Sequence, residues 1–464
     1  MNNIEPYILF MDYEKAFDFI NRALLLEKLM NKGAGSKYVK ALYESYTYTS
    51  YKPKISEKYT GAAIDTDSGV TQGKTSSANL FSFYVSDMVR TTAIPPNDSD
   101  IFQLADDTAI LCNHLQSLIN RFRLLLKYSK DNYLLANMGK TKYLQLTRNT
   151  SIPTPITIEE NLTVKPCEDG YRYLGIKIIR SNYIYEQIMS NINERKGNII
   201  KFYHWVDNHK YAPFNVKLQV LYTCLLPSIF YGAETWWILD QLKPTILEIE
   251  RNALKKCMGV RKTITTDLIY LEMNRPDYAS FLQDQQYNFY HKIKNLSEEE
   301  SIIKTIMNRC STTNMMSYYE NLLNNNNKKL NIDERLNRVK TNTSTMTKRY
   351  MDISNGKYAS HIYDFNLCEE YRTLLTRWRL SCHDLEIETG RYKNIPTELR
   401  LCSLCSTVED EHHVFFNCPR YSLARAKCPE LIKNKKISDI LHPSTTEAAK
   451  KAGKLIKDIE SIRK

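Results

Sequence analysis

Two adjacent carboxylates, Asp106 and Asp107, interrupt an otherwise apolar stretch that runs from Gln103 to Leu111. Apolar runs that break at an acidic pair are typical of a β-hairpin with the acids at its turn. Neighbouring carboxylates repel each other unless a cation neutralises them, and Mg²⁺ prefers such oxygen ligands. The stretch therefore predicts a metal site, with an ordinary solvated turn as the alternative.

A third carboxylate, Asp12, follows the apolar run Tyr7–Met11 near the start of the chain. A strand that ends in an acid holds a metal ligand on a stiff support. Asp12 is thus a candidate ligand, although a helix N-cap would also explain it.

The composition fits a folded protein of two to four domains, with 464 residues of which 42% are hydrophobic. A net charge of +12 and 32 tyrosines permit a polyanionic partner. The eleven cysteines are odd in number and no signal peptide is recognisable, which favours a reducing, intracellular compartment. The most apolar window, 220–239, contains Pro227, Gly232 and Glu234, so we expect a buried helix pair and no membrane span.

The elements expected around the carboxylates alternate between helices and strands. A loop at Gly69–Ser77 allows close backbone approach, and either contacts a nucleotide or caps the next helix. The order of elements predicts an α+β fold with an antiparallel sheet backed by helices. Helices are expected at 36–48, at 115–126 and from Leu80 to Met88, and strands at Tyr7–Met11 and 143–146.

Five stretches in order resemble the motifs of a reverse transcriptase, and more narrowly the polymerase of non-LTR (LINE-type) retrotransposons. The resemblance implies a right-hand polymerase palm with a helical thumb and a small C-terminal zinc-binding region. The stretches are 10–18 (FMDYEKAFD), 69–73 (GVTQG) with Ser77 and 80–81, 104–107 (LADD), Asn137 with 140–141, and 173–175 (YLG).

The resemblance implies that Asp12 and Asp106 bind two Mg²⁺ ions, with Asp107 in support. Two metals about 3.5–4 Å apart serve both ends of an in-line displacement, so acids from two separate strands are needed. Lys140 matches a lysine that protonates or neutralises the departing pyrophosphate, the alternative being an ordinary surface lysine.

Other matched positions concern the nucleotide and the primer. Phe17 matches a bulky residue under the sugar of the incoming nucleotide, although an ordinary core phenylalanine is the alternative. Gln72 and Gly73 match a loop along the templating base and nucleotide. Ser77 matches the serine of a Ser-Pro pair in which Ala78 replaces the proline. The primer-gripping hairpin would carry Tyr173, Leu174 and Gly175.

The resemblance divides the chain into four parts: a palm at 1–185, a thumb at 186–265, a helical connection with an Asn-rich linker at 266–365, and the zinc-binding region at 366–464. Helices in the thumb are expected to break at Pro213 and Pro227. Basic thumb residues would contact phosphates of the template and primer, or form a solvated face. They are Lys243, Arg251, Lys255, Lys256, Arg261 and Lys262.

A Cys-x₂-Cys-x₇-His-x₄-Cys spacing is present at Cys402, Cys405, His413 and Cys418. Four such ligands suit one tetrahedral, structural Zn²⁺. His412 is the rival for the third ligand, and the family spacing favours His413. Nearby basic residues either contact nucleic acid or only add solubility: Arg420, Arg425 and Lys427.

The predicted function is RNA-directed DNA polymerisation, with an RNA template, a DNA primer and dNTPs as partners. The resemblance adds genomic target DNA as a partner and nuclear localisation. We expect the family's fingers and endonuclease to be missing, since the chain starts just before the Asp12 strand. The alternative is therefore an inactive remnant that only binds nucleic acid. The sequence leaves the oligomeric state open.

Overall fold

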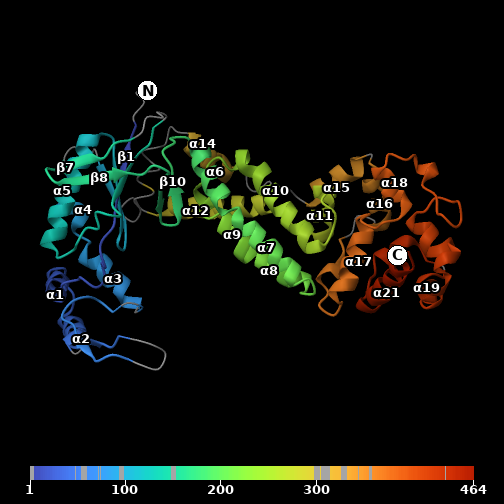
Figure 1. Cartoon of the computed structure of the whole chain (residues 1–464), viewed down its shortest axis with the longest axis horizontal. Coiled ribbons are helices and arrows are strands. Elements are labelled where there is room, and N and C mark those ends of the chain that lie inside the picture. Colours follow the sequence, from blue (N-terminus) through green and yellow to red (C-terminus); the bar gives the residue numbers. More distant parts are fainter. Residues whose placement is uncertain are drawn as a thin grey trace. The chain divides into compact units, whose positions relative to one another are not determined.

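The structure is a computed structural model in which two compact units can be distinguished, Met1–Asn191 and Ile192–Lys464 (Figure 1). Every described strand lies in the first unit, and the described regular elements of the second are helices. The residues described are 5–47, 49–53, 60–71, 73, 75–93, 99–147, 153–296, 304, 314–324, 332–342, 344–354, 358–433 and 435–463.

A six-stranded sheet forms the centre of the first unit, in the order β4-β5-β1-β6-β8-β7. Neighbouring strands are antiparallel except β6 and β8, which pair in parallel. The predicted antiparallel sheet is confirmed apart from this one pair. The strands are β1 (Tyr7–Met11), β4 (Ser99–Leu104), β5 (Asp107–Cys112), β6 (Lys142–Gln145), β7 (Ile156–Glu159) and β8 (Leu162–Pro166), with a short pair β2 (Ser50–Tyr51) and β3 (Ile64–Asp65) outside the sheet.

Helices cover one face of this sheet. Helix α5 (Leu115–Asp131) packs against β1, β4, β5 and β7, and Figure 1 shows it on one side of the strands. Its buried residues Leu118, Phe122 and Leu125 recur at helical spacing, and they join Leu9 and Ile110 in one core. The other helices of this unit are α1 (Arg22–Asn31), α2 (Ser36–Thr47), α3 (Thr75–Tyr84) and α4 (Met88–Thr91).

A short hairpin covers part of the opposite face. It consists of β9 (Tyr171–Tyr173) and β10 (Ile176–Ile178). The ring of Tyr171 stacks on Phe10 of β1, with centroids 4.2 Å apart and planes 6° apart. Phe10 also belongs to a small second core with Ala109 and Leu144. Alternate residues of β1 and β5 thus face the helices and this hairpin in turn.

The second unit is built from helices, with α6 (Ile184–Arg195) crossing the division between the units. Helix α8 begins directly after Pro213, as predicted. The break expected at Pro227 is wrong, because the helical backbone continues from α8 through η1 into α9, and Pro227 lies in the first turn of α9, where its missing N–H costs little. Among the described helices, none combines the length and apolar character that a membrane span needs. The asparagine-rich stretch after Asn324 lies outside the described residues. The elements are α7 (Gly197–Asn208), α8 (Phe214–Val220), a π-helical turn η1 (Leu221–Leu225), α9 (Leu226–Ile229), α10 (Leu239–Met258), α11 (Thr266–Met273), α12 (Tyr278–Asn295), α14 (Asn314–Asn324), α15 (Ile332–Thr341), α16 (Thr345–Ser354), α17 (Glu369–Arg379), α18 (Glu386–Tyr392), α19 (Ser422–Ala426), α20 (Ile437–Leu441) and α21 (Thr446–Arg463).

A buried carboxylate, Glu250, ties helix α10 to three other segments. Its Oε1 accepts a hydrogen bond from the Tyr222 hydroxyl (2.6 Å). Its Oε2 accepts from the Tyr270 hydroxyl (2.5 Å) and from the Tyr278 backbone N–H (2.9 Å). Burial raises the pKa of Glu250 to about 7 although these donors oppose the rise. Helix α10 is therefore held by an acid that can ionise near neutral pH.

Glu250→Gln should gain stability relative to the wild type as pH rises. Between the ordinary Glu pKa near 4.5 and about 7, the folded chain holds a proton that the unfolded chain has released. Stability of the wild type therefore falls as pH increases through about 7, and glutamine removes this dependence. Urea unfolding of both proteins at pH 5 and pH 8 measures this difference in stability. Tryptophan fluorescence can follow the unfolding of the second unit, since all four tryptophans, at 205, 236, 237 and 378, lie in it.

Glu248→Gln is the matched control, because Glu248 is exposed on the same helix. The difference in stability between Glu248→Gln and the wild type should be the same at pH 5 and pH 8. An equal difference between Glu250→Gln and wild type at both pH values would contradict the prediction.

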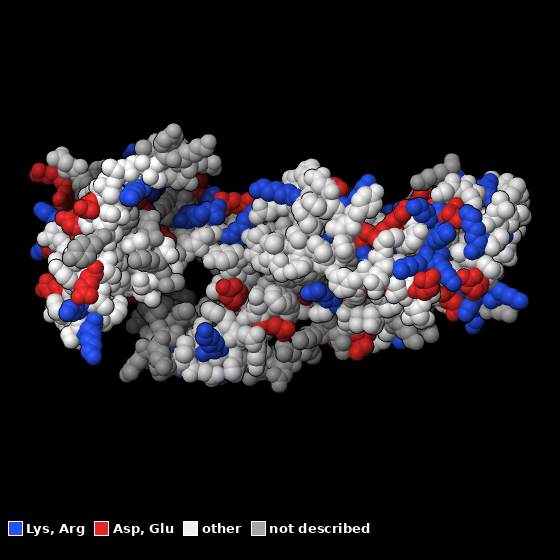
Figure 2. All heavy atoms as spheres, turned by 90° about the horizontal axis from the view of Figure 1, so that it is seen from below, with Lys and Arg blue, Asp and Glu red and all other residues white. Residues whose placement is uncertain are grey.

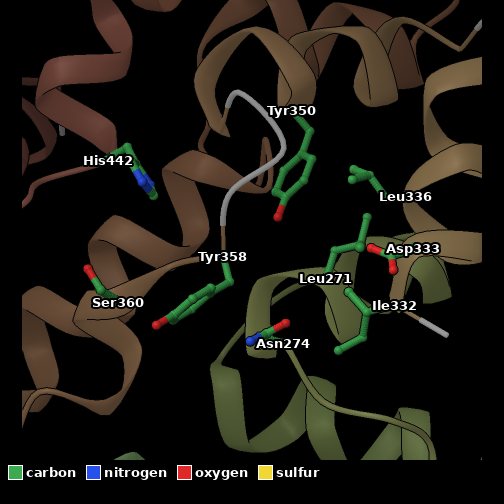
Figure 3. Close-up of a pocket in the computed structure, with 9 residues that line it drawn as sticks. All are labelled: Leu271, Asn274, Ile332, Asp333, Leu336, Tyr350, Tyr358, Ser360 and His442. Carbon is green, nitrogen blue, oxygen red and sulfur yellow. The ribbon is translucent and has the colours of Figure 1, made fainter.

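A buried ion pair lies deeper in the second unit. Glu272 and Arg379 are both fully buried and are joined by two hydrogen bonds, of 2.6 and 3.0 Å. Glu272 also accepts from the Tyr350 hydroxyl (3.0 Å), and Arg379 donates to His442 Nδ1 (2.9 Å). Figure 3 shows Tyr350 and His442 on the walls of a cavity of about 410 Å³. The ion pair thus connects two walls of this cavity.

Candidate active site

The pairing of β1 with β5 brings two of the predicted carboxylates together. Tyr7 lies opposite Cys112 and Met11 opposite Thr108, so Asp12 and Asp107 are the next cross-strand neighbours. Both continue the alternation of the residues that face the β9–β10 hairpin. Burial and the carboxylates of Asp12 and Asp107 accordingly raise the pKa of Tyr171 on that hairpin.

The acidic pair lies at the turn between β4 and β5, as the sequence predicts. The backbone at Ala105 has a positive φ of 52°, and Asp106 completes the reversal before β5 begins at Asp107. Burial, Asp106 and Asp12 all raise the pKa of Asp107. Three carboxylates therefore repel one another here, which is the electrostatic condition of a cation site.

A loop from the end of α5 to β6 carries Lys140 to Asp12. Asn137 anchors this loop, since its N–H donates to the backbone oxygen of Asp12 (2.8 Å). The Asn137 side chain in turn accepts from the Lys140 N–H (3.2 Å). Lys140 Nζ then lies 3.5 Å from Asp12 Oδ2, while the lysine side chain stays largely exposed. A cationic group thus stands beside the carboxylates without being buried.

The surroundings of the Asp12 carboxylate also support metal binding at this site. Its Oδ2 is buried and has no hydrogen-bond partner within the described part of the chain, although Lys140 lies at ion-pair distance. A buried anionic oxygen without a donor is costly unless a cation reaches it. The oxygen-rich set of Asp12, Asp106 and Asp107 fits Mg²⁺ in chemistry.

The glycine-containing loop packs on the turn that follows Asp12. Gly69 N–H donates to the Ile20 oxygen (2.8 Å), and Val70 N–H donates to the Phe17 oxygen (2.9 Å). Gly69 has a φ of +80°, and a Cβ there would approach the Asp18 oxygen to 2.8 Å. Only glycine fits this contact. The loop and the Asp12 turn therefore form one rigid corner.

Those predicted nucleotide-contacting residues that the structure describes lie at or near this corner. The half-buried Phe17 ring contacts Phe81, with centroids 4.9 Å apart, so it also packs on the core. Gly73 has a φ of +84° and open space around its Cα. The buried Ser77 hydroxyl donates to the Thr71 oxygen and ties the loop to the start of α3. Gln72 lies outside the described residues.

The predicted primer-gripping hairpin has a two-residue turn at Leu174 and Gly175, where φ is 49° and 80°. Positive φ at both positions is typical of a type I′ hairpin turn. The Tyr173 hydroxyl donates to the Phe102 oxygen of β4 (3.1 Å), which holds the hairpin on the sheet. Leu174 is partly exposed at the tip.

Arg22, which the sequence analysis did not identify, supports the corner, and Tyr171, the first residue of the predicted primer-gripping hairpin, supports that hairpin. Arg22 is buried and donates to the backbone oxygens of Gly69 (2.8 Å) and Tyr46 (3.1 Å). Tyr171 lies two positions before Tyr173 and stacks on Phe10. No local pattern indicates that Arg22 is buried.

The sheet of the first unit therefore presents carboxylates from two neighbouring strands on one face, with helices on the other. Residues 2–178 match the family model described as reverse transcriptase (RNA-dependent DNA polymerase). This stretch is a reverse transcriptase domain by sequence. It covers less than half of the 464 residues and ends within the first unit.

Comparison with solved structures finds fungal telomerases at low similarity. Apo telomerase from Candida tropicalis, truncated from its C-terminal domain, is 16% identical over 33% of this chain and 32% of its own, with a TM-score of 0.28. Telomerase from Candida albicans with a TWJ fragment of telomeric RNA is 14% identical over 65% of this chain and 49% of its own, with a TM-score of 0.23. Telomerase from Candida tropicalis with a TWJ fragment of telomeric RNA is 12% identical over 68% of this chain and 49% of its own, with a TM-score of 0.30. This chain thus spans about half of their length or less. No curated protein matches it.

The basic residues predicted to bind nucleic acid differ in their surroundings. Lys255 is buried, and its ammonium donates to the Lys262 oxygen (2.5 Å). A phosphate contact at Lys255 would require this bond to break. Arg251 contacts Thr266 (3.3 Å), and Lys256 pairs with Asp207 (2.5 Å). Lys243 is half-buried on the same helix.

The four residues of the C-terminal Cys-His pattern meet at one point. Ligand atoms of Cys402, Cys405, His413 and Cys418 all lie within 4.8 Å of one another. Cys418 Sγ is 3.9 Å from Cys402 Sγ and 3.7 Å from Cys405 Sγ. Four ligands around zinc with bonds near 2.3 Å would place sulfurs about 3.8 Å apart. The spacing fits a tetrahedral zinc site.

His413 is the histidine that faces the thiols. Its Nε2 is buried and has no hydrogen-bond partner among the described residues, which is the condition of a metal-binding nitrogen. His412 is exposed instead, and its ring lies against Phe416. Burial would raise the pKa of Cys402, but backbone N–H groups of Leu404 and Cys405 reverse this and lower it. These donors favour the thiolate that zinc requires.

Basic side chains near the thiols bond within the chain. Arg420 donates to Ser403 (2.8 Å), Arg425 donates to the Val414 oxygen (3.0 Å), and Lys427 pairs with Asp458 (3.0 Å). Figure 2 shows basic and acidic side chains interleaved over this part of the molecule, at the right of the view. On this face, the described residues support the solubilising interpretation better than a continuous nucleic-acid surface.

Proposed function

We propose that this chain is an RNA-directed DNA polymerase of the non-LTR retrotransposon type, which extends a DNA primer with dNTPs on an RNA template. One observation carries the proposal: Asp12 and Asp107 are cross-strand neighbours beside Asp106, with Lys140 at 3.5 Å from Asp12. The family match of residues 2–178 supports the polymerase activity. The retrotransposon type rests on the motif resemblance and on the Cys-His cluster.

The carboxylates have the central role in this proposal. Asp12 and Asp106 hold two Mg²⁺ ions and Asp107 supports them. When bound, these ions make the primer 3′-hydroxyl nucleophilic and stabilise charge on the leaving pyrophosphate. The stiff β1–β5 pair keeps the acids in place, so little reorganisation is needed during the reaction. Lys140 neutralises or protonates the pyrophosphate as it leaves.

The corner formed by the Asp12 turn and the glycine-containing loop receives the nucleotide in this proposal. Phe17 lies under its sugar and clashes with a 2′-hydroxyl, while Gln72 and Gly73 line the templating base. Tyr173, Leu174 and Gly175 grip the primer end. Lys243, Arg251 and Lys256 contact backbone phosphates from the thumb at 186–265.

The C-terminal part at 366–464 has a structural role in this proposal. Cys402, Cys405, His413 and Cys418 hold one Zn²⁺, which stabilises a loop-rich segment. Genomic target DNA is the further partner, and action on it places the protein in the nucleus. The connection at 266–365 joins this part to the thumb.

Primer extension tests the proposed activity against nucleic-acid binding alone. A labelled DNA primer annealed to RNA is incubated with the chain, Mg²⁺ and dNTPs, and binding of the same duplex is followed by fluorescence anisotropy. Extension that requires the RNA template supports the polymerase. Binding without extension would leave a remnant that binds nucleic acid.

Lys140→Ala should lower the maximal rate of primer extension by about 10²-fold and leave the KM for dNTP nearly unchanged, because the lysine acts on a charge that develops during the reaction. Lys140→Arg keeps the cation but is a poor proton donor. Steady-state kinetics over a range of pH values separate these roles.

Lys130→Ala is the matched control, since Lys130 is exposed at the end of α5. It should extend primers at the wild-type rate. An unchanged rate in Lys140→Ala would remove this lysine from the mechanism.

A further inference from the structure

The loop between the second and third zinc-binding residues brings Thr407 back beside Cys402. Cys402 N–H donates to the Thr407 oxygen (2.7 Å), and Ser406 N–H donates to the Cys402 oxygen (3.0 Å). Ser406 has a positive φ of 52°, which closes the turn. Thr407 is exposed, so its side chain does not contribute to the core. Its position is set by this turn.

The Thr407 hydroxyl contacts the imidazole of His413. Thr407 Oγ1 lies 3.2 Å from His413 Nδ1. The carboxylate of Asp410 makes a different contact, because its Oδ1 accepts from the backbone N–H of His413 (2.8 Å). Asp410 thus fixes the backbone of His413, and Thr407 is placed to act on the ring.

A neutral imidazole has one N–H donor and one nitrogen that accepts. His413 Nε2 is buried beside the thiols and finds no hydrogen-bond partner in the part of the chain that the structure describes, so it is the nitrogen available to a metal. The ring proton must then be on Nδ1, and it needs an acceptor. Thr407 Oγ1 supplies lone pairs at hydrogen-bond distance, while its own proton can turn toward solvent.

We infer that Thr407 is a positioning residue that holds His413 in the Nδ1–H tautomer and so directs Nε2 to the metal. The inference rests on the proposed zinc site and extends it to a residue outside the Cys-His spacing. Hydrogen bonds to the second nitrogen of a metal-binding histidine orient the ring and raise its basicity. The sequence pattern alone does not identify Thr407.

Zinc affinity of the full chain tests this inference. Thr407→Val keeps the shape of the side chain but removes the acceptor, so the affinity for Zn²⁺ should fall about 10- to 100-fold in competition with a chelator of known affinity. Thr407→Ser keeps the hydroxyl and should restore near wild-type affinity. Ser403→Ala is the matched control, because it also removes an exposed hydroxyl near the thiols. The Ser403 hydroxyl contacts Arg420 and not His413.

The tautomer itself gives a second measurement that a merely structural role would not change. In the zinc-free chain labelled with ¹⁵N-histidine, NMR should show the proton of His413 on Nδ1 in the wild type. Thr407→Val should shift it toward Nε2, with the circular dichroism spectrum unchanged.

Wild-type zinc affinity in Thr407→Val, or an unchanged tautomer, would overturn the inference and leave the zinc site standing. A wild-type chain that binds no zinc would instead overturn the proposed site, and the inference with it.

Discussion

Asp12→Asn should reduce RNA-templated primer extension by at least about 10³-fold, the scale of losing a group that stabilises developing charge. The amide keeps the size of the side chain and removes the charge from Oδ2, a buried oxygen that lacks a hydrogen-bond donor. Since the neutral side chain no longer repels Asp107, folding should not suffer. The rate of single-nucleotide extension and the Kd for the primer–template measure both effects, and the Kd should stay near wild type.

Asp100→Asn provides the control for Asp12→Asn. Asp100 is exposed on β4, in the hairpin whose turn carries Asp106 and Asp107, and it lies opposite Leu111, away from that acidic turn. It should extend primers normally. If Asp12→Asn and Asp100→Asn extended equally well, the carboxylate cluster could not be the catalytic centre.

Arg379→Met should destabilise the second unit by about 3–5 kcal/mol, because it leaves Glu272 charged and buried without its partner. Both side chains are fully buried, and the carboxylate would keep only the Tyr350 hydroxyl among these contacts. Urea unfolding followed by tryptophan fluorescence reports on this unit. The midpoint should move to lower urea, with little change in the slope.

Two further variants separate the ion pair from simple loss of packing. Lys457→Met breaks a half-exposed pair with Glu370 between α21 and α17, the helix that also carries Arg379, and its midpoint should match the wild type. The double variant Arg379→Met with Glu272→Leu should recover part of the loss, since no unpaired charge remains. A double variant that is as destabilised as Arg379→Met alone, or more so, would contradict the role of the pair.

Local patterns predicted the elements that carry the carboxylates. The strand at Tyr7–Met11 and the hairpin around Asp106 are visible as apolar runs that end at acids, and the structure has them at these positions. Helix α5 was predicted from the spacing of Leu118, Phe122 and Leu125. Periodicity succeeds here because each element buries one face against the same sheet.

Contacts between residues distant in the sequence were not predictable in this way. Glu272 and Arg379 are 107 positions apart, and nothing local to either shows that they pair. The parallel β6–β8 pairing likewise depends on where the chain returns to the sheet. The burial of Lys255 depends on the turn that follows α10, which places the Lys262 oxygen within reach. Long-range packing determines the first two contacts, and the conformation of the turn after α10 determines the third.

The candidate site was predictable from local sequence only in part. The four zinc-binding candidates follow from their spacing, and the structure brings them within 4.8 Å. The orientation of His413 depends on Thr407, whose contact arises only when the loop closes. In the palm, the motif resemblance indicated Lys140, while its approach to Asp12 depends on Asn137 holding the loop to the Asp12 backbone.

Single-nucleotide extension by the wild-type chain tests the central claim most directly. A DNA primer annealed to an RNA template of defined sequence is given Mg²⁺ and one dNTP at a time. The account predicts that the primer grows by one residue only with the dNTP complementary to the next template base, and only when Mg²⁺ is present. A chain that binds this duplex tightly and never extends it would contradict the account.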